Sequence, residues 1–135
     1  MTKLYQDTIL AISSDFYSLE EREAWAKSDL IAYDERFKES YTLVAFEDQK
    51  IVGFGNIHGS GYLDMLYVSK DHQKRGIATK LCNELEGHFQ TSKIKVHASK
   101  SALSFFMKRG YKIIKDQEVL RHGVILKNYV MEKTL

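Results

Sequence analysis

The spacing of apolar residues changes after about the first 40 positions, which divides the chain into a helical part and a strand-rich part. The opening segment places apolar side chains at helical intervals, at Leu4, Ile9, Ile12 and Phe16. Ser18 with Glu21 three positions later is a capping box, and Ser28 with Asp29 marks the start of a further short helix through residues 30–40. We therefore expect helices, not strands, in this part of the chain.

From residue 41 the apolar residues recur at every second position, as in half-buried strands. Three such segments follow one another, separated by the short turns "DQK" and "GSG": residues 41–47, 51–59 and 62–69. Turns this short connect neighbouring antiparallel strands. The pattern predicts an antiparallel three-stranded meander.

The rest of the chain alternates between helical and strand patterns. A helix beginning at Ile77 carries an apolar stripe that ends at Phe89, and a shorter helix ends at Gly110 in the position after its cap. Strands are predicted over residues 93–99, 111–116 and 123–133. Because a strand–helix–strand unit needs a parallel crossover, we expect one parallel pair inside a mostly antiparallel sheet. The predicted fold is a single mixed α/β domain over residues 1–135, with helices on both faces of the sheet.

Composition narrows the function classes. The 135 residues carry 20 Lys+Arg against 18 Asp+Glu, so the net charge of +2 argues against a dedicated nucleic-acid-binding protein. The single cysteine excludes an intrachain disulfide, and the five histidines show no metal-ligand spacing. No apolar run has the length of a signal peptide or a membrane span, so we expect a cytoplasmic protein with no membrane contact.

The stretch "HQKRGIATKL" joins the third strand to the long helix and concentrates basic residues around a glycine. It could be a nucleic-acid patch, a solvated turn or a phosphate site. A helix start exposes backbone N–H groups that hold phosphate oxygens, and Gly76 with Ala78 lets a ligand approach the backbone closely. Lys74 and Arg75 add positive charge. The stretch matches neither the Walker loop nor the dinucleotide fingerprint, and it suits a pyrophosphate.

Residues 73–78 read Gln-Lys-Arg-Gly-Ile-Ala and match the pattern Gln/Arg-x-x-Gly-x-Gly/Ala. In its context, "LDMLYVSKDHQKRGIATKL", this segment resembles the central motif of the GNAT superfamily of acyl-CoA N-acyltransferases. The later "ALSFFMKRGYKI" resembles that family's helix followed by Gly-Phe or Gly-Tyr, and the resemblance extends over residues 41–134. It implies an N-acetyltransferase in which an amine attacks acetyl-CoA directly in a ternary complex. The ending "HGVILKNYVMEK" resembles small bacterial members, which favours a small-molecule acceptor over a protein amino group.

The resemblance also implies where acetyl-CoA binds, namely between the strands at 62–69 and 93–99. The pantetheine arm would pair with the backbone of Leu66, Tyr67 and Val68, and an N–H near Leu66 or Tyr67 would stabilise the oxyanion. The residues implied for the rest of the donor are backbone groups on the pyrophosphate, a hydroxyl, an aromatic ring against pantetheine and a cation near the 3′-phosphate: Gln73, Lys74, Arg75, Gly76, Ile77, Ala78, Thr79, Phe105 and Lys108.

Catalysis needs a base, because an amine acceptor is mostly protonated at neutral pH. Asp64 lies two residues before Leu66 on the strand that would carry the acetyl group, and we favour it over Glu20 and Glu21. The alternative is that Asp64 is an ordinary solvent-facing strand residue. Where the family often has a tyrosine as general acid, this chain has Phe106. Water or another residue, such as Tyr67 or Tyr111, would then protonate the departing thiolate, or the thiolate would leave unprotonated.

The helical N-terminal part lines the acceptor site in the family. Tyr17 and Trp25 are therefore the candidate substrate contacts, although aromatic residues at such positions are more often core. The chain also begins inside the first helix, where the family usually has a strand beforehand. An uncovered strand edge at residues 41–47 tends to pair with another chain, and we consider a homodimer or a late start of the sequence equally.

Two other functions remain open at this stage. The phenylalanine at position 106 and the shortened start are compatible with a non-catalytic acyl-CoA-binding module. Nucleic-acid binding through Lys74, Arg75 and Lys80 is the weaker alternative, because the net charge is close to neutral and no aromatic residues are interleaved with these basic residues.

Overall fold

The computed structural model describes residues 2–12, 14–27, 40–89 and 91–135. The helix expected from Ser28 onward lies outside these residues. The described elements are, in chain order, α1 (Thr2–Leu10), α2 (Leu19–Lys27), β1 (Ser40–Glu47), β2 (Lys50–His58), β3 (Tyr62–Val68), η1 (Lys70–His72), α4 (Ile77–His88), β4 (Lys93–Ser99), α5 (Leu103–Lys108), β5 (Lys112–Arg121) and β6 (Val124–Thr134).

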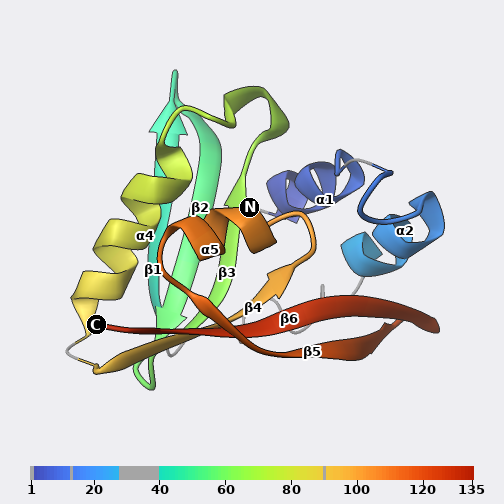
Figure 1. The fold of residues 1–135 in the computed structure, drawn as a ribbon. Coiled ribbons are helices and arrows are strands. Elements are labelled where there is room, and N and C mark those ends of the chain that lie inside the picture. The colour runs from blue at the N-terminus through green and yellow to red at the C-terminus, as the bar shows by residue number, and fades with distance from the viewer. Residues whose placement is uncertain (1, 13, 28–39, 90) are drawn as a thin grey trace.

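One six-stranded sheet organises the molecule, in the order β1-β2-β3-β4-β6-β5. All neighbours are antiparallel except β3 and β4, which are parallel. Figure 1 shows α4 along one side of the sheet and α1 with α2 on the other side, while α5 lies over the middle of the sheet. The mixed α/β fold, the meander and the single parallel pair are confirmed.

Side-chain hydrogen bonds mark the start of α2 and the end of α1. In the capping box, the N–H of Glu21 donates to Oγ of Ser18 at 3.1 Å and the N–H of Ser18 donates to Oε1 of Glu21 at 2.9 Å. The helical spacing predicted to continue to Phe16 ends at Leu10 instead. Arg22 explains the end of α1, because its guanidinium donates to the backbone carbonyls of Leu10 and Ile12, both at 2.8 Å.

Two glycines set the distance between α4 and the sheet. A Cβ added at Gly53 would lie 3.2 Å from Cγ2 of Ile77, and one at Gly55 would lie 2.9 Å from Cδ1 of Leu85. The helix therefore packs against bare backbone on β2. The apolar stripe predicted for this helix faces the main core, where Leu81 and Leu85 are buried.

The last two strands form a longer hairpin than the sequence pattern predicted. β5 continues to Arg121 and pairs with β6 up to Val124, so only His122 and Gly123 form the turn. Both residues have positive φ, 46° and 77°, the conformation of a two-residue hairpin turn that matches the twist of the strands. The sequence pattern predicts a strand only over residues 111–116, because His-Gly is not one of the usual dipeptides of a two-residue turn.

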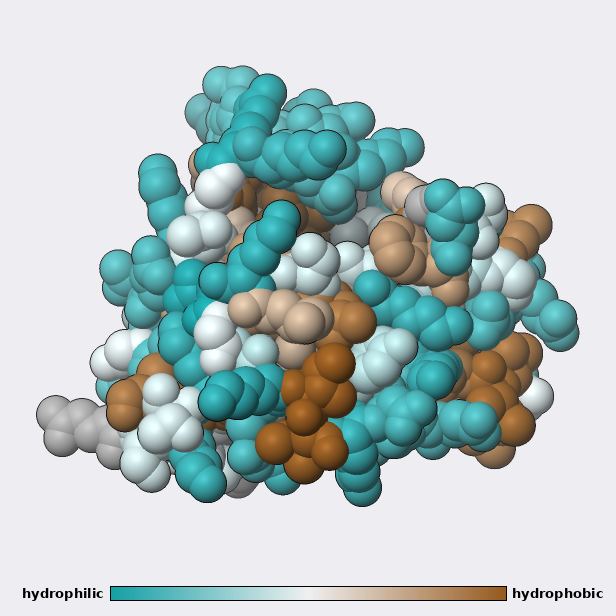
Figure 2. All heavy atoms as spheres, viewed as in Figure 1, coloured by the Kyte–Doolittle hydropathy of each residue, from teal (hydrophilic) through white to brown (hydrophobic). Residues whose placement is uncertain are grey.

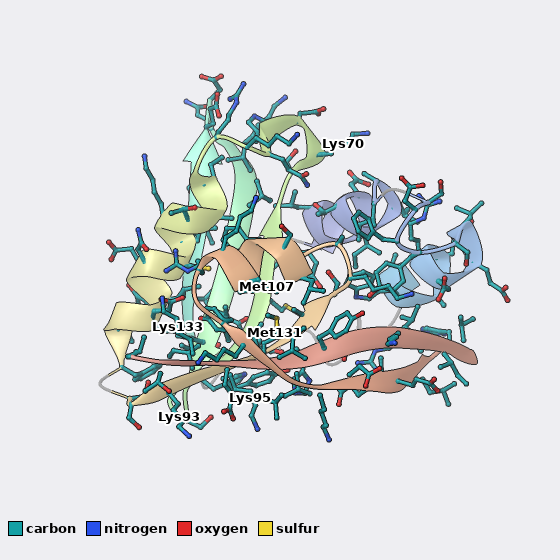
Figure 3. All side chains as sticks on the ribbon, in the orientation of Figure 1. Lys70, Lys93, Lys95, Met107, Met131 and Lys133 are labelled. Atoms are coloured by element: carbon teal, nitrogen blue, oxygen red, sulfur yellow. The ribbon has the colours of Figure 1, made fainter. Side chains whose placement is uncertain are left out.

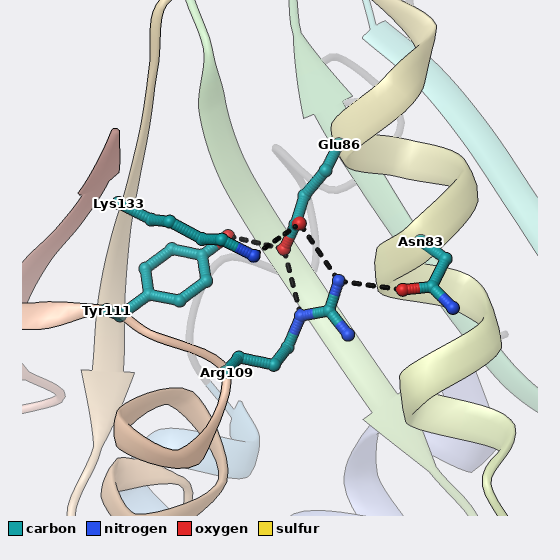
Figure 4. A network of polar contacts seen from close by, with 5 residues as sticks. All are labelled: Asn83, Glu86, Arg109, Tyr111 and Lys133. Atoms are coloured by element: carbon teal, nitrogen blue, oxygen red, sulfur yellow. Dashed lines mark hydrogen bonds and ion pairs between the residues drawn. The ribbon is translucent and has the colours of Figure 1, made fainter. Parts of the chain in front are cut away.

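A hydrogen-bond network joins α4 to the C-terminal half of the sheet (Figure 4). The buried carboxylate of Glu86 accepts hydrogen bonds from Arg109 at 2.9 and 3.0 Å, from the hydroxyl of Tyr111 at 2.8 Å and from Nζ of Lys133 at 3.2 Å. Asn83 accepts a further bond from Arg109 at 2.9 Å. Burial alone would raise the pKa of Glu86, but these donors lower it below its usual value.

Apolar side chains also reach the surface over β5 and β6, where Figure 2 shows brown patches between hydrophilic regions. The exposed apolar residues of this hairpin are Ile113, Ile114, Leu120 and Ile125. At the other edge of the sheet Phe46 of β1 is 66% exposed. Both edges of the sheet thus carry apolar surface in the described structure.

Candidate active site

The parallel strands β3 and β4 separate soon after they meet. They pair only at Tyr62 with Lys95 and at Leu63 with Val96, although both strands continue for several residues. Among the described residues, the pairing of the two strands ends at Leu63 with Val96. The separation opens the middle of the sheet on the side where α4 begins.

A bulge in β3 marks the point of separation. Asn56 of β2 is opposite Met65, but Ile57 is opposite Leu63, so Asp64 is the extra residue. The buried side chain of Asn56 stabilises this irregularity, because its Oδ1 accepts a hydrogen bond from the N–H of Met65 at 3.0 Å. The bulge re-aims the strand, and the Asp64 side chain lines the cleft.

The cleft between the two strands has a volume of about 70 Å³. Residues from β3, β4, α2 and α5 with its preceding turn line it: Trp25, Leu63, Asp64, Met65, Leu66, Tyr67, Val96, His97, Ala98, Ser99, Ala102 and Phe106. The structure therefore brings Asp64, Leu66, Tyr67 and Trp25 together around one opening.

Two charged or titratable side chains lie on opposite walls of the cleft. The Asp64 side chain is only 5% exposed, and its Oδ2 lies 3.4 Å from Nε2 of His58 on β2. Across the cleft, Nδ1 of His97 lies 3.3 Å from the amide nitrogen of Gln117. Burial lowers the pKa of His97, and the charge of Lys95 adds to this effect while that of Asp64 opposes it, so the neutral imidazole is favoured at neutral pH.

The residues predicted to hold a pyrophosphate form the exposed turn that enters α4. Gly76 is the N-cap of this helix with φ 78°, and no side chain caps it. The first intrahelical bond is donated by Lys80 to the carbonyl of Gly76, so the N–H groups before it are available to a ligand. Thr79 is exposed in the first turn of the helix. This geometry suits a bound anion.

The side chains of the turn are partly committed to other contacts. Arg75 forms an ion pair with Glu47 at 3.1 Å, and His72 lies 3.6 Å from the same carboxylate. The side-chain amide of Gln73 donates to the carbonyl of Val68 at 3.3 Å, which ties the turn to the end of β3. Lys74 is exposed with φ 63°.

Tyr111 does not fit the role of general acid that the sequence analysis left open for it. Its hydroxyl is buried and donates to Glu86, and it is not among the cleft residues. Burial, followed by the bond to Glu86, raises the pKa of Tyr111 well above its usual value. Phe106 lines the cleft, and its ring packs edge-on against Tyr111 with centroids 5.1 Å apart.

The two predicted substrate contacts differ in their surroundings. Trp25 lines the cleft, whereas Tyr17 is buried and is not among the lining residues. The hydroxyl of Tyr17 donates to the carbonyl of Lys127 at 2.6 Å and accepts from the N–H of Lys100 at 2.9 Å. These two bonds fix the segment before α2 to the loop after β4 and to β6. Burial raises the pKa of Tyr17.

The remaining predicted donor residues lie on α5. Phe105 is half-buried beside Phe106, and Lys108 is exposed at the end of the helix. The helix ends at Lys108 with Arg109 as its C-cap, and Gly110 takes the next position as predicted, where the N–H groups of Gly110 and Tyr111 donate to the carbonyls of Met107 and Phe106. Figure 3 shows that Lys70 lies beside the turn before α4, whereas Lys93 and Lys95 lie at the opposite end of the sheet.

Sequence reasoning did not identify His58 as part of the site. The contact with Asp64 joins two strands across a bulge, and no local pattern announces it. In the part of the chain that the structure describes, no group of three or more His, Cys, Asp or Glu residues is placed to bind a metal ion. Nor does any described helix have the length and apolar character needed to cross a membrane.

Comparisons with known proteins identify the family of the chain. A family model described as an acetyltransferase (GNAT) domain matches residues 13–133. The Escherichia coli protein YafP, described as an uncharacterized N-acetyltransferase, is 32% identical over 119 residues, which cover 88% of this chain and 77% of the relative.

Solved structures show the same fold. The crystal structure of a GCN5-related N-acetyltransferase from Rhodopseudomonas palustris superposes with a TM-score of 0.88 at 34% identity, covering 99% of this chain and 87% of the other. The PaiA N-acetyltransferase of Thermoplasma acidophilum, solved in complex with coenzyme A, gives a TM-score of 0.71 at 18% identity, with 99% and 90% covered. At that identity the second likeness concerns the fold alone.

Proposed function

Because the chain belongs to the GNAT acetyltransferase family, we propose that it transfers an acetyl group from acetyl-CoA to an amine, with both substrates bound at once. The observation that carries this proposal is the cleft between β3 and β4, which has a nearly buried carboxylate on one wall. The uncapped start of α4 follows β3 in the chain. One anion site and one base are what this reaction requires.

The donor half of the site uses backbone groups. Where β3 has separated from β4, its backbone at Leu66, Tyr67 and Val68 can hydrogen-bond the amide-containing pantetheine arm as an added strand would. The exposed turn from Gln73 to Ala78 would hold the pyrophosphate, and nothing lies within 4 Å of a Cβ position at Gly76. This open space is compatible with a close approach of phosphate oxygens. Lys108 remains our candidate for the 3′-phosphate.

The acceptor half of the site must remove protons. An ammonium group loses one proton to become a nucleophile, and a second after the C–N bond has formed and the C–S bond has broken. Asp64 is the carboxylate among the described cleft residues, so we assign it the first proton, and the second passes to solvent water. Tyr67 lines the same wall and follows Leu66, near which the thioester would bind. Phe106 stands where a proton-donating tyrosine was expected, and its ring cannot donate a proton. The thiolate therefore leaves unprotonated, which a thiol pKa near 8.5 permits.

Donor binding is tested by thermal unfolding. Acetyl-CoA at about 100-fold over its Kd should stabilise the protein by about 2.7 kcal/mol. Gly76→Glu should abolish this shift, because it adds a negative charge and strain at φ 78°. Gly123→Glu is the matched control, since Gly123 has φ 77° and equally open surroundings but lies in the β5–β6 turn. An equal loss in both variants, or no shift in the wild type, would contradict the site.

Turnover is tested by release of the coenzyme A thiol with a panel of amines: a polyamine, an aminoglycoside, free amino acids and peptides with a free N-terminus. We expect at least one small amine to be acetylated. Asp64→Asn should lower kcat by about 100-fold or more while the thermal shift with acetyl-CoA persists. Binding of acetyl-CoA without release by any amine would contradict the enzymatic proposal.

A further inference from the structure

His58 is the histidine in contact with the proposed base, and it lies outside the cleft. Its Nε2 is 3.4 Å from Oδ2 of Asp64, yet it is not among the residues that line the opening. The Asp64 side chain is 5% exposed, while that of His58 is 28% exposed. The pair therefore connects the interior of the cleft to the solvent.

We propose that His58 is a proton-relay residue that acts through Asp64, an inference that rests on the proposed function. A carboxylate with so little exposed surface cannot release each captured proton directly to bulk water once substrates fill the cleft. Asp64 takes the proton from the ammonium and passes it from Oδ2 to Nε2 of His58. His58 then releases a proton to solvent, so both side chains return to their starting charge. Histidine suits this step because its charge changes near neutral pH.

The strand geometry holds the two side chains together. The bulge at Asp64 turns its side chain toward β2, and the ring of Tyr62 stacks on that of His58 with centroids 6.0 Å apart and planes 15° apart. This stacking restricts the ring without using either of its nitrogens. Tyr62 also contacts His97, at 5.2 Å between centroids, so it separates the two histidines.

Other titratable and charged groups face the pair from neighbouring strands. Tyr62 of β3 stacks on His58, Tyr67 of β3 and His97 of β4 line the cleft with Asp64, and the charges of Lys95 on β4 and Lys115 on β5 act on His97. His97 is the rival relay, because it lines the cleft itself. Its lowered pKa favours the neutral ring, and its Nδ1 already contacts Gln117. A relay through His58 does not require the pKa of His97 to rise or its contact with Gln117 to break.

The test uses the full chain, acetyl-CoA and the amine from the panel that wild type acetylates fastest. His58→Ala should lower kcat at neutral pH by about tenfold or more, with the KM for acetyl-CoA unchanged. Added imidazole should restore the kcat of this variant in proportion to the imidazole concentration. A bulky buffer of similar pKa should restore it less. His58→Gln keeps an amide near the position of Nε2 and should still show the loss, because an amide cannot titrate. A purely structural role for His58 would give no dependence on imidazole.

The matched control is His122→Asn in the β5–β6 turn, where asparagine tolerates the φ of 46°. It should leave kcat and its response to imidazole unchanged. Wild-type kinetics in His58→Gln, or imidazole rescue of His97→Ala but not of His58→Ala, would overturn the relay while the proposed function stands. Absence of turnover in wild type would overturn both.

Discussion

Asp64 and Glu86 are both carboxylates with little exposed surface, but their partners give them opposite roles. Glu86 accepts hydrogen bonds from Arg109, Tyr111 and Lys133, so both of its carboxylate oxygens are occupied by structural contacts. Asp64 lines a cleft and has an imidazole at 3.4 Å. A fully satisfied carboxylate fixes the packing around it, whereas one beside a titratable ring can exchange a proton.

Replacing Glu86 by Gln should reduce the free energy of unfolding by about 3 kcal/mol at pH 7, because two cations then lose a buried counter-charge. The folded state lowers the pKa of Glu86. The stabilisation is therefore present above the unfolded-state pKa of about 4.3 and is lost as the pH falls through the lower folded-state value. Urea unfolding at pH 7 and at stepwise lower pH measures both effects.

Glu84→Gln on the exposed side of the same helix is the control, and it should change stability by less than about 0.5 kcal/mol. The difference between wild type and Glu86→Gln should narrow below about pH 4. A difference that is independent of pH would show that the charge of Glu86 does not carry the stabilisation.

Tyr111→Phe separates structure from catalysis at a neighbouring position. Loss of the hydroxyl removes one hydrogen bond to a charged group and should cost about 1.5–3 kcal/mol of unfolding free energy. Because Tyr111 lies outside the cleft, kcat at a temperature where the variant is folded should match wild type. A large loss of kcat with little loss of stability would restore Tyr111 as a candidate acid.

Among the elements, those with a local signal could be predicted from the sequence. The capping box at Ser18 and Glu21, the short turns of the meander and the glycine that ends α5 all act through residues a few positions apart. The length of β5 depended on the unusual turn at His122 and Gly123, and the end of α1 depended on Arg22 reaching back to its carbonyls. The contacts of Arg22 span 12 and 10 residues and leave no periodicity to detect, whereas His-Gly is not one of the usual dipeptides of a two-residue turn.

The same distinction holds for the site. The turn from Gln73 to Ala78 has a motif in sequence, and the structure places it at an uncapped helix start. Asp64 was placed on the correct strand, but its bulge and the contact with His58 follow from the pairing of β2 with β3. The burial of Tyr17 and the two hydrogen bonds of its hydroxyl likewise depend on the packing of α2 against β6.

The close packing of α4 on β2 predicts opposite outcomes for two glycine substitutions. Gly55→Ala places a methyl group 2.9 Å from Leu85 and 3.0 Å from the carbonyl oxygen of Met65, and should cost about 1–3 kcal/mol of unfolding free energy. Gly87→Ala in α4 meets no atom within 4 Å and should stabilise by up to about 1 kcal/mol, because alanine is the better helix former. Thermal or urea unfolding of both variants measures these effects, and equal signs would contradict the packing argument.

For the whole molecule, the edge position of β1 predicts a homodimer formed by pairing of this strand with its copy. Phe46→Lys places a charge on that edge and should shift the protein toward the monomer in light scattering after size exclusion. Lysine on an edge strand opposes such pairing.

Leu120→Lys is the matched control, because Leu120 has the same 66% exposure but lies on the hairpin at the other edge of the sheet. It should leave the dimer intact. Dissociation by Leu120→Lys alone would move the interface to β5 and β6, and a wild-type monomer at high concentration would rule out the dimer.

The short pairing of β3 with β4 has a mechanical consequence for the domain. In the described structure, the ladder between the half-sheet β1–β2–β3 and the half-sheet β4–β6–β5 consists of Tyr62 with Lys95 and Leu63 with Val96, and the carbonyl of Gly61 accepts a further hydrogen bond from the N–H of Lys95 at 2.9 Å. We expect a force that pulls the two halves apart to separate β3 from β4 before the strands within either half separate. A ligand bound between β3 and β4 would resist this separation, so the force needed to separate the two strands should rise with the occupancy of the ligand.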